Sequence, residues 1–184
     1  MTWDLPLNVE INGEIHAIRN KCDYRVILDV ISALNDEELT YEEKILCALF
    51  IFYEDNSKID DIETATKEMF RIINCGEKEE AQNNKPRLMD WEHDFKQIAP
   101  PVSRVLGYDI RTPNKYTHWY SFLGGYQEIG GDCVFATIIS IRNKRAKSQK
   151  LEKWELDFLK EHRKMIDLPS KLTADEEELL NSDW

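Results

Sequence analysis

Apolar and polar residues alternate from Leu7 to Arg19, on both sides of Asn12–Gly13. A period of two gives a strand one core face, and Asn-Gly supplies the positive φ angles of a type I′ turn. The sequence therefore predicts a short β-hairpin at the front of the chain. Because a lone hairpin is only marginally stable, we expect it to pack against helices.

After Asp23 the apolar positions recur three and four residues apart, which is the period of a helix. Asp23 can cap a first helix that reaches about Leu34. Thr40 and Glu43 have the spacing of a capping box and open a second helix that runs to about Tyr53. This second helix is apolar nearly all round, so we expect it to be the buried, central helix of the fold.

A third helix is expected from about Asp60 to Asn74, with Gly76 at its C-terminal cap. Its predicted core positions are Ile62, Ala65, Met69, Phe70 and Ile73. The polar, aperiodic segment 77–88 that follows is predicted to be an exposed linker.

The pattern from Asp90 to Leu106 is again helical, but Pro100–Pro101 interrupts it. Each proline lacks an amide donor, and its ring clashes with the preceding turn. We therefore expect a break or kink at this position.

Residues 118–133, HWYSFLGGYQEIGGDC, contain two glycine pairs after an aromatic stretch. They match neither a P-loop nor a dinucleotide-binding loop, so we interpret them as a helix C-cap followed by a tight turn. The β-branched segment Cys133–Arg142 fits strand or helix, and its length together with the basic residues after it favours helix. A last amphipathic helix is expected over Leu151–Ile166, lined by Leu151, Trp154, Phe158, Leu159 and Met165.

Together these segments predict a mainly α fold. We expect a single helical domain over residues 1–168, with about six to seven helices and the N-terminal hairpin, followed by an acidic C-terminal tail over 169–184.

The net charge of −11 disfavours DNA and anionic membranes as partners, because both would be repelled. A basic run from Ile141 to Lys150 is the exception, and we interpret it as a solvated helix face. The longest apolar runs are shorter than the roughly 20 residues that cross a bilayer. The N-terminus does not resemble a signal peptide, and the four scattered cysteines suit buried, reduced thiols in a cytoplasm.

No motif for nucleophilic catalysis or cofactor binding is present in the sequence, so we expect neither an enzyme nor a cofactor site. Asp90, His93 and Asp94 would share one helical face and could in principle ligate a metal. With no second cluster of ligands, a solvated polar face opposite Trp91 and Phe95 explains the same residues, and no metal site is expected. Function is therefore expected to be carried by surfaces.

The order of these segments resembles the tail assembly chaperones of long-tailed phages of Gram-positive bacteria, the family named for bacteriophage gene-product fifteen. The resemblance rests on VEINGEIHAI, DYRVILDVISALND, TYEEKILCALFIFYED, DWEHDFKQI, LGYDI, HWYSFLGGY, IISIRNKR and the charged final helix. It covers roughly residues 5–168. The double proline departs from the family, which usually continues a helix there.

The resemblance implies a chaperone that keeps the long, helical tape-measure protein soluble in the host bacterial cytoplasm while tail-tube subunits polymerise around it. The tape-measure protein is then the expected partner, with the tail-tube protein as a second one, and self-association is left open by the sequence. Helix-in-groove contact is the natural mode of binding. Trp119, Phe122, Leu123, Trp154 and Phe158 are the candidate contact residues, against the alternative that each belongs to the core. Two other functions stay open at this point: a structural tail or head-completion subunit, and an acidic regulatory protein that binds a host factor.

Overall fold

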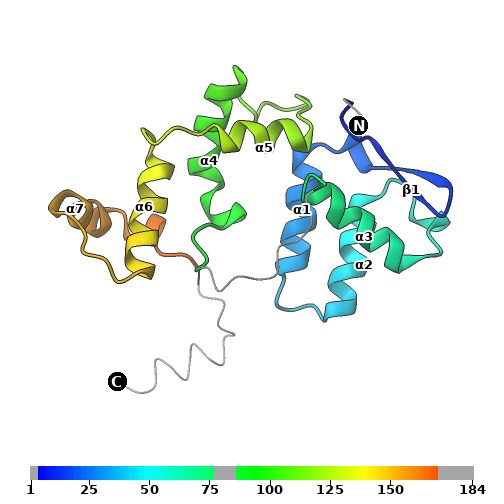
Figure 1. Cartoon of the computed structure of the whole chain (residues 1–184), viewed down its shortest axis with the longest axis horizontal. Coiled ribbons are helices and arrows are strands. Elements are labelled where there is room, and N and C mark those ends of the chain that lie inside the picture. Colours follow the sequence, from blue (N-terminus) through cyan, green and yellow to red (C-terminus); the bar gives the residue numbers. More distant parts are fainter. Residues whose placement is uncertain (1–3, 77–85, 170–184) are drawn as a thin grey trace. The chain divides into compact units, whose positions relative to one another are not determined.

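The computed structural model describes residues 4–76 and 86–169, and these residues form a mainly α protein. Within them lie eight α-helices, two short 3-10 helices and one two-stranded sheet (Figure 1). The mainly α fold with an N-terminal hairpin is thus confirmed. Most of the predicted linker and the acidic tail lie outside the described residues.

The chain divides into two compact units, which are described separately. Unit 1 contains Met1–Lys85 and Ile98–Gly130, and unit 2 contains Pro86–Gln97 and Gly131–Trp184. The division therefore falls within one helix and between the two glycines of the second pair.

Unit 1 begins with the predicted hairpin, in which β1 (Asn8–Ile11) pairs antiparallel with β2 (Glu14–Ala17). The turn residues Asn12 and Gly13 have φ angles of 52° and 87°, as a type I′ turn requires. The hairpin packs against the third helix, which supplies the cover that two strands need.

The caps of the first two helices also lie where the sequence places them. The Asp23 carboxylate accepts the Arg25 amide at the start of α1 (Tyr24–Asn35). At the start of α2 (Tyr41–Phe52), Thr40 and Glu43 form the complete capping box. The two helices lie side by side in Figure 1.

The third helix, α3 (Ile62–Ile73), has Asn74 as its C-cap, so the prediction of Gly76 at this position is wrong. Gly76 lies two residues beyond the cap, has φ 79° and donates its amide to the Arg71 carbonyl at 2.7 Å. Its N-cap is Asp61, close to the predicted start at about Asp60. The buried face is formed by Ala65, Met69 and Ile72. Ile62, which we expected in the core, is 48% exposed.

A break at the double proline, one of the two expected outcomes, is wrong, because α4 runs from Trp91 to Leu106 through both prolines. The other outcome, a kink, stays a prediction. Two helical hydrogen bonds are lost there, since neither proline has an N–H. The segment is nevertheless held by tertiary packing: Ile98, Ala99 and Val102 are completely buried in unit 1.

The glycine-pair prediction is wrong for the first pair and confirmed for the second. Gly124 and Gly125 lie inside α5 (Trp119–Gln127), whose C-cap is Glu128. A Cβ on Gly125 would lie 3.2 Å from Leu106 Cγ and 3.3 Å from Val102 Cγ1, so this glycine allows α5 to approach the end of α4 closely. The second pair lies in the connection to α6 (Val134–Ala146), which is the helix that the sequence favoured over a strand.

An aromatic stack forms the middle of unit 1. Tyr24 and Phe122 lie parallel with ring centroids 4.5 Å apart, and Trp119 stacks on Phe122 at 5.6 Å. The indole N–H of Trp119 donates to the Ile73 carbonyl at 2.9 Å, and the Tyr24 hydroxyl donates to the Ile110 carbonyl at 3.0 Å. These contacts connect α1, α3 and α5 through buried polar atoms that all have partners.

In unit 2 the predicted final helix is divided at His162 into α7 (Lys153–Glu161) and α8 (Arg163–Ile166). Its core consists of Ile138, Ile141 and Ile166, against which Leu151, Phe158, Leu159 and Met165 pack. Trp154, which we expected on the same side, is 57% exposed.

Candidate protein-docking groove

The second helix is not the buried, central helix that its composition predicts. One face of α2 is in the core of unit 1 and carries Ile45, Ala48, Leu49 and Phe52. The opposite face remains apolar but is open to solvent: Leu46 is 53% exposed and Phe50 is 68% exposed. An α-helix that buries only half of an all-round apolar surface leaves a stripe that favours contact with a partner.

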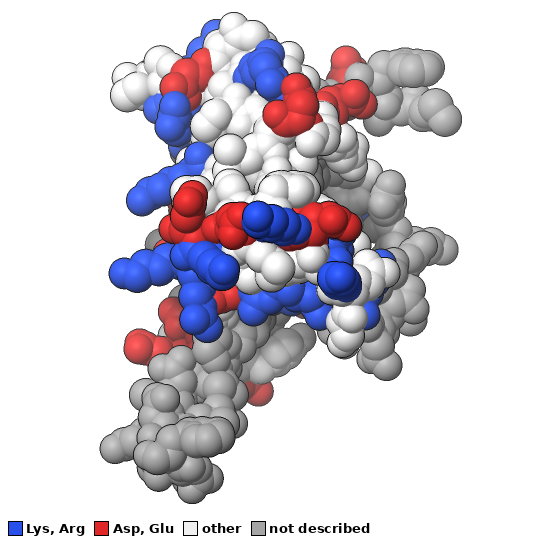
Figure 2. All heavy atoms as spheres, turned by 90° about the vertical axis from the view of Figure 1, so that its left-hand side faces the viewer, with Lys and Arg blue, Asp and Glu red and all other residues white. Residues whose placement is uncertain are grey.

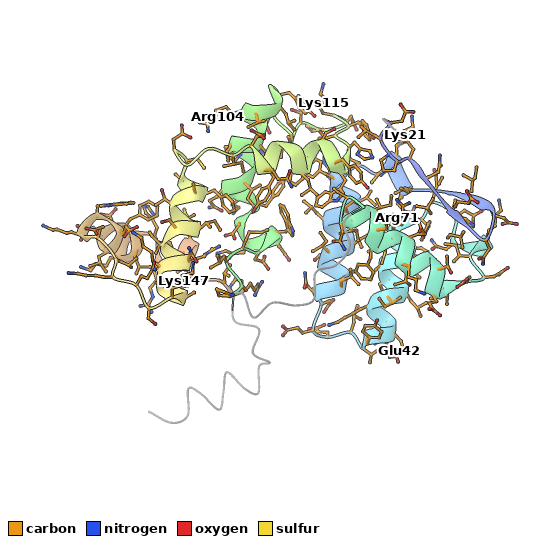
Figure 3. The ribbon with its side chains drawn as sticks, in the orientation of Figure 1. Lys21, Glu42, Arg71, Arg104, Lys115 and Lys147 are labelled. Carbon is orange, nitrogen blue, oxygen red and sulfur yellow. The ribbon has the colours of Figure 1, made fainter. Side chains whose placement is uncertain are left out.

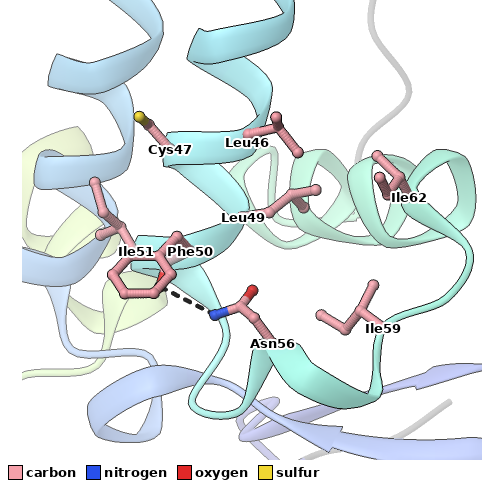
Figure 4. A pocket seen from close by; sticks show the side chains of 8 residues that line it. All are labelled: Leu46, Cys47, Leu49, Phe50, Ile51, Asn56, Ile59 and Ile62. Carbon is pink, nitrogen blue, oxygen red and sulfur yellow. Dashed lines mark hydrogen bonds between the residues drawn. The ribbon is translucent and has the colours of Figure 1, made fainter.

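This exposed face forms one side of an open depression of about 640 Å³. The other side comes from the 3-10 helix η2 (Asn56–Lys58), from Ile59 and from the start of α3. In Figure 4, Leu46 and Leu49 lie opposite Ile59 and Ile62, with Asn56 between Phe50 and Ile59. We call this depression the α2 groove; it is lined by Leu46, Cys47, Leu49, Phe50, Ile51, Asn56, Ile59 and Ile62.

Arg19 stabilises the groove at the C-terminal end of α2. Its guanidinium donates to three main-chain carbonyls there, those of Phe50, Ile51 and Tyr53, at 2.7 to 2.9 Å. Its central carbon also lies 5.8 Å from the centroid of the Phe50 ring. A cation at a helix C-terminus is favourable, and a cation over an aromatic face is attracted to it. Phe50 is therefore a supported, exposed aromatic side chain, the type that often dominates the energy of protein interfaces.

The polar residues considered for metal binding have a structural role instead. Asp94 is fully buried and forms a bidentate ion pair with Arg142, with N–O distances of 2.6 and 2.8 Å. Arg142 also donates to the carbonyls of Leu88, Met165 and Ile166, so all five of its N–H groups have acceptors. The interpretation of this face as solvated is wrong for Asp94, and no group of three or more potential metal ligands lies within residues 4–76 and 86–169.

The basic run is likewise more than a solvated face. Besides the buried Arg142, Lys144 binds both carboxylate oxygens of Glu155, and Arg145 pairs with Asp167. Glu155 is only 1% exposed, and its hydrogen bond from Lys144 lowers the pKa of its carboxyl group. On the side of the molecule that carries α7, Figure 2 shows basic and acidic side chains interspersed. These cations therefore serve mainly to hold unit 2 together.

Comparison with known proteins identifies the family. The model of the family described as "Bacteriophage Gp15 protein" matches residues 1–168, which is most of the chain. The chain belongs to this family. No curated protein and no solved structure matches it. The resemblance derived from the order of the segments is thus confirmed at the level of the family.

In this Gp15-family chain the five predicted contact residues have different environments. Trp119 and Phe122 are buried in the aromatic stack, and Leu123 on the same helix is half-buried. In unit 2, Phe158 packs against the core and Trp154 is exposed. A role in partner binding stays a prediction for all five, and only Trp154 presents most of its surface to solvent.

The Gp15-family sequence did contain a signal for the groove, which we assigned to the core. All nine residues from Ile45 to Tyr53 are apolar, which is more than one buried face of a helix can hold. Two isoleucines, Ile59 and Ile62, follow shortly after. An excess of apolar residues on one helix predicts either full burial or an exposed docking face, and only packing distinguishes the two. None of the helices within the described ranges is long and apolar enough to span a membrane.

Proposed function

We propose that this Gp15-family protein is a tail assembly chaperone that binds the tape-measure protein of its phage and keeps it soluble until the tail tube forms around it. The observation that carries the proposal is the α2 groove, an exposed apolar surface on an otherwise charged protein. A long helical partner with an apolar stripe self-associates unless that stripe is covered. A groove between helices is a recurrent way of covering one.

The charge of the chain supports the same function. With a net charge of −11, several copies bound along one partner would remain soluble, and their mutual repulsion would favour release. We further propose that the protein acts in the host cytoplasm, where the tail is built, and that the tail-tube protein is a second partner.

Co-expression tests the proposal directly. The tape-measure protein is expressed with and without this chain, and its soluble fraction and co-purification are measured. We expect soluble complex only in the presence of the chain, and a strong loss of it with Phe50→Glu. If the tape-measure protein remains insoluble with the wild-type chain and nothing co-purifies, the proposal is wrong.

Mass spectrometry of purified virions separates this function from that of a structural tail or head-completion subunit. A chaperone leaves the particle, so its peptides are expected in infected-cell lysate and not in virions. Recovery at the stoichiometry of a structural component would replace the chaperone with the structural alternative.

A further inference from the structure

Acidic residues are numerous in the segment 42–63, which forms the α2 groove. The segment 42–63 carries two basic residues, Lys44 and Lys58, and Lys58 forms an ion pair with Asp55. Arg19 adds one further cation, at the C-terminal end of α2 beside Phe50. Figure 3 shows Glu42 at the end of α2. The acidic residues of this segment are Glu42, Glu43, Glu54, Asp55, Asp60, Asp61 and Glu63.

Three of these acids also accept hydrogen bonds that cap the groove-forming elements, and these bonds favour the ionised carboxylate. The Thr40 amide and hydroxyl lower the pKa of Glu43 at the start of α2. The Ser57 hydroxyl and amide lower the pKa of Asp55 at η2, and the Thr64 amide and hydroxyl lower that of Asp61 at α3. The same hydrogen bonds that define the starts of these elements therefore stabilise negative charge on the segment that forms the groove.

We propose that the α2 groove binds an amphipathic helix whose apolar stripe is flanked by lysine or arginine. Leu46 and Phe50 are spaced four residues apart on α2, so they can receive apolar side chains from a helix lying along it. The basic flanks of that helix then face the acidic residues of the segment 42–63. The volume of about 640 Å³ is of the size that holds a few apolar side chains.

Charge disfavours the other obvious occupants. The C-terminal segment 175–184 has five acidic residues and no basic one, so it would bring negative charge to an acidic segment. A second copy of the chain also carries a net charge of −11. Like charges placed together at an interface oppose binding, whereas opposite charges steer and orient it. The inference rests on the proposed function in one respect: it assumes that this helix belongs to the apolar tape-measure protein.

The test uses the full-length chain and two synthetic helical peptides with the same apolar stripe. One peptide has lysine flanks and the other has glutamate at the same positions. Binding is measured by fluorescence anisotropy at low and high salt. We expect the lysine peptide to bind at least about tenfold more tightly, with an affinity that falls as salt rises.

Thiol labelling locates the bound peptide with an internal control. Cys47 lines the groove, while Cys75 is also exposed but does not line it. Burial raises the pKa of Cys22 to about 12, so this thiol does not compete for the reagent. The lysine peptide should slow the labelling of Cys47, quantified by mass spectrometry, and leave that of Cys75 unchanged.

Two pairs of variants separate the apolar and the electrostatic contributions. Phe50→Glu should weaken binding at least about tenfold, whereas Ile15→Glu changes an equally exposed apolar residue outside the groove and should have no effect. Glu42→Gln with Asp60→Asn should weaken binding of the lysine peptide roughly three- to tenfold and flatten its salt dependence. Glu10→Gln with Glu37→Gln is the control for net charge, and it should change neither the binding of the lysine peptide nor its salt dependence.

The inference is wrong if both peptides bind alike, or if Cys47 and Cys75 are protected equally. It is also wrong if Phe50→Glu and Ile15→Glu have the same effect. The proposed function has a separate readout, the solubility of the tape-measure protein. If the Phe50→Glu variant solubilises it as well as the wild-type chain does, the chaperone function stands and the groove is not its binding site. Failure of the wild-type chain to solubilise it rejects the chaperone, while the peptide result stands by itself.

Discussion

Alanine at the two glycines of α5 should have opposite effects on stability. In the middle of a helix, Gly→Ala is favourable by about 0.8–1.0 kcal/mol because alanine loses less backbone entropy on folding. A Cβ on Gly124 meets nothing within 4 Å, so Gly124→Ala should gain most of this amount. The added methyl group at Gly125 has no such space.

At Gly125 the gain in helix propensity competes with overpacking. The new Cβ would lie 3.2 Å and 3.4 Å from Leu106 Cγ and Cδ2, and 3.3 Å from Val102 Cγ1. Val102 is fully buried and cannot move freely, and overpacking of this kind typically costs about 1–3 kcal/mol. After the gain in propensity, Gly125→Ala should be destabilising by up to about 2 kcal/mol. The gap between the two variants should therefore be about 1–3 kcal/mol.

Urea unfolding followed by far-ultraviolet circular dichroism measures both variants, and hydrogen exchange of α5 shows whether the change is local. A double-mutant cycle with Leu106→Ala provides the sharper test, because that change removes two of the three close atoms. Gly125→Ala should cost less in this background, and Gly124→Ala should give the same gain in both. Equal effects of the two alanines, or no coupling to Leu106, would refute the close approach of α4 and α5.

Further predictions concern the buried ion pair and the cap of α5. Asp94→Asn leaves the buried Arg142 without a counter-charge and should destabilise unit 2 by about 3–5 kcal/mol, measured by hydrogen exchange of α6. The control Asp157→Asn changes an exposed ion pair and should have little effect on stability. Similar effects of the two variants would contradict the role of burial. His118 caps α5 through Nδ1, and burial lowers its pKa below the ordinary 6.5. The unfolded chain therefore takes up protons first as the pH falls, so stability should decrease below about pH 6.5. His118→Asn retains a capping side chain and should remove this part of the pH dependence; an identical pH profile of unfolding in both proteins would show that His118 does not contribute.

Local chemistry made much of the fold predictable from the sequence. Three features depend only on atoms a few residues apart: the Asn12–Gly13 turn, the Asp23 cap and the Thr40–Glu43 capping box. The local amino-acid sequence is therefore enough to specify their geometry. The family was recognisable for a related reason: the order of such local signals along 168 residues is more specific than any one of them.

Errors occurred where a local rule competed with packing. The rule that proline breaks helices predicted a break in α4, but the buried residues on both sides of Pro100–Pro101 keep the helix continuous. Glycine as a helix stop failed at Gly125 for a similar reason, since close contact with Leu106 and Val102 favours a residue without a side chain inside the helix. In both places a gain from tertiary contacts exceeds the local cost, which is about 1 kcal/mol for a glycine and about 3 kcal/mol for a proline inside a helix.

The sequence by itself determined that this is a mainly helical, acidic member of a phage family, and which residues begin its first helices. Only the tertiary structure decided which side of α2 is covered, that Arg142 is buried against Asp94, and that Trp119 belongs to the core. The physical reason is that periodicity identifies an apolar side chain but does not identify what it packs against. Phe50 and Phe52 are the same residue type two positions apart, and one is open to a partner while the other is closed in the core.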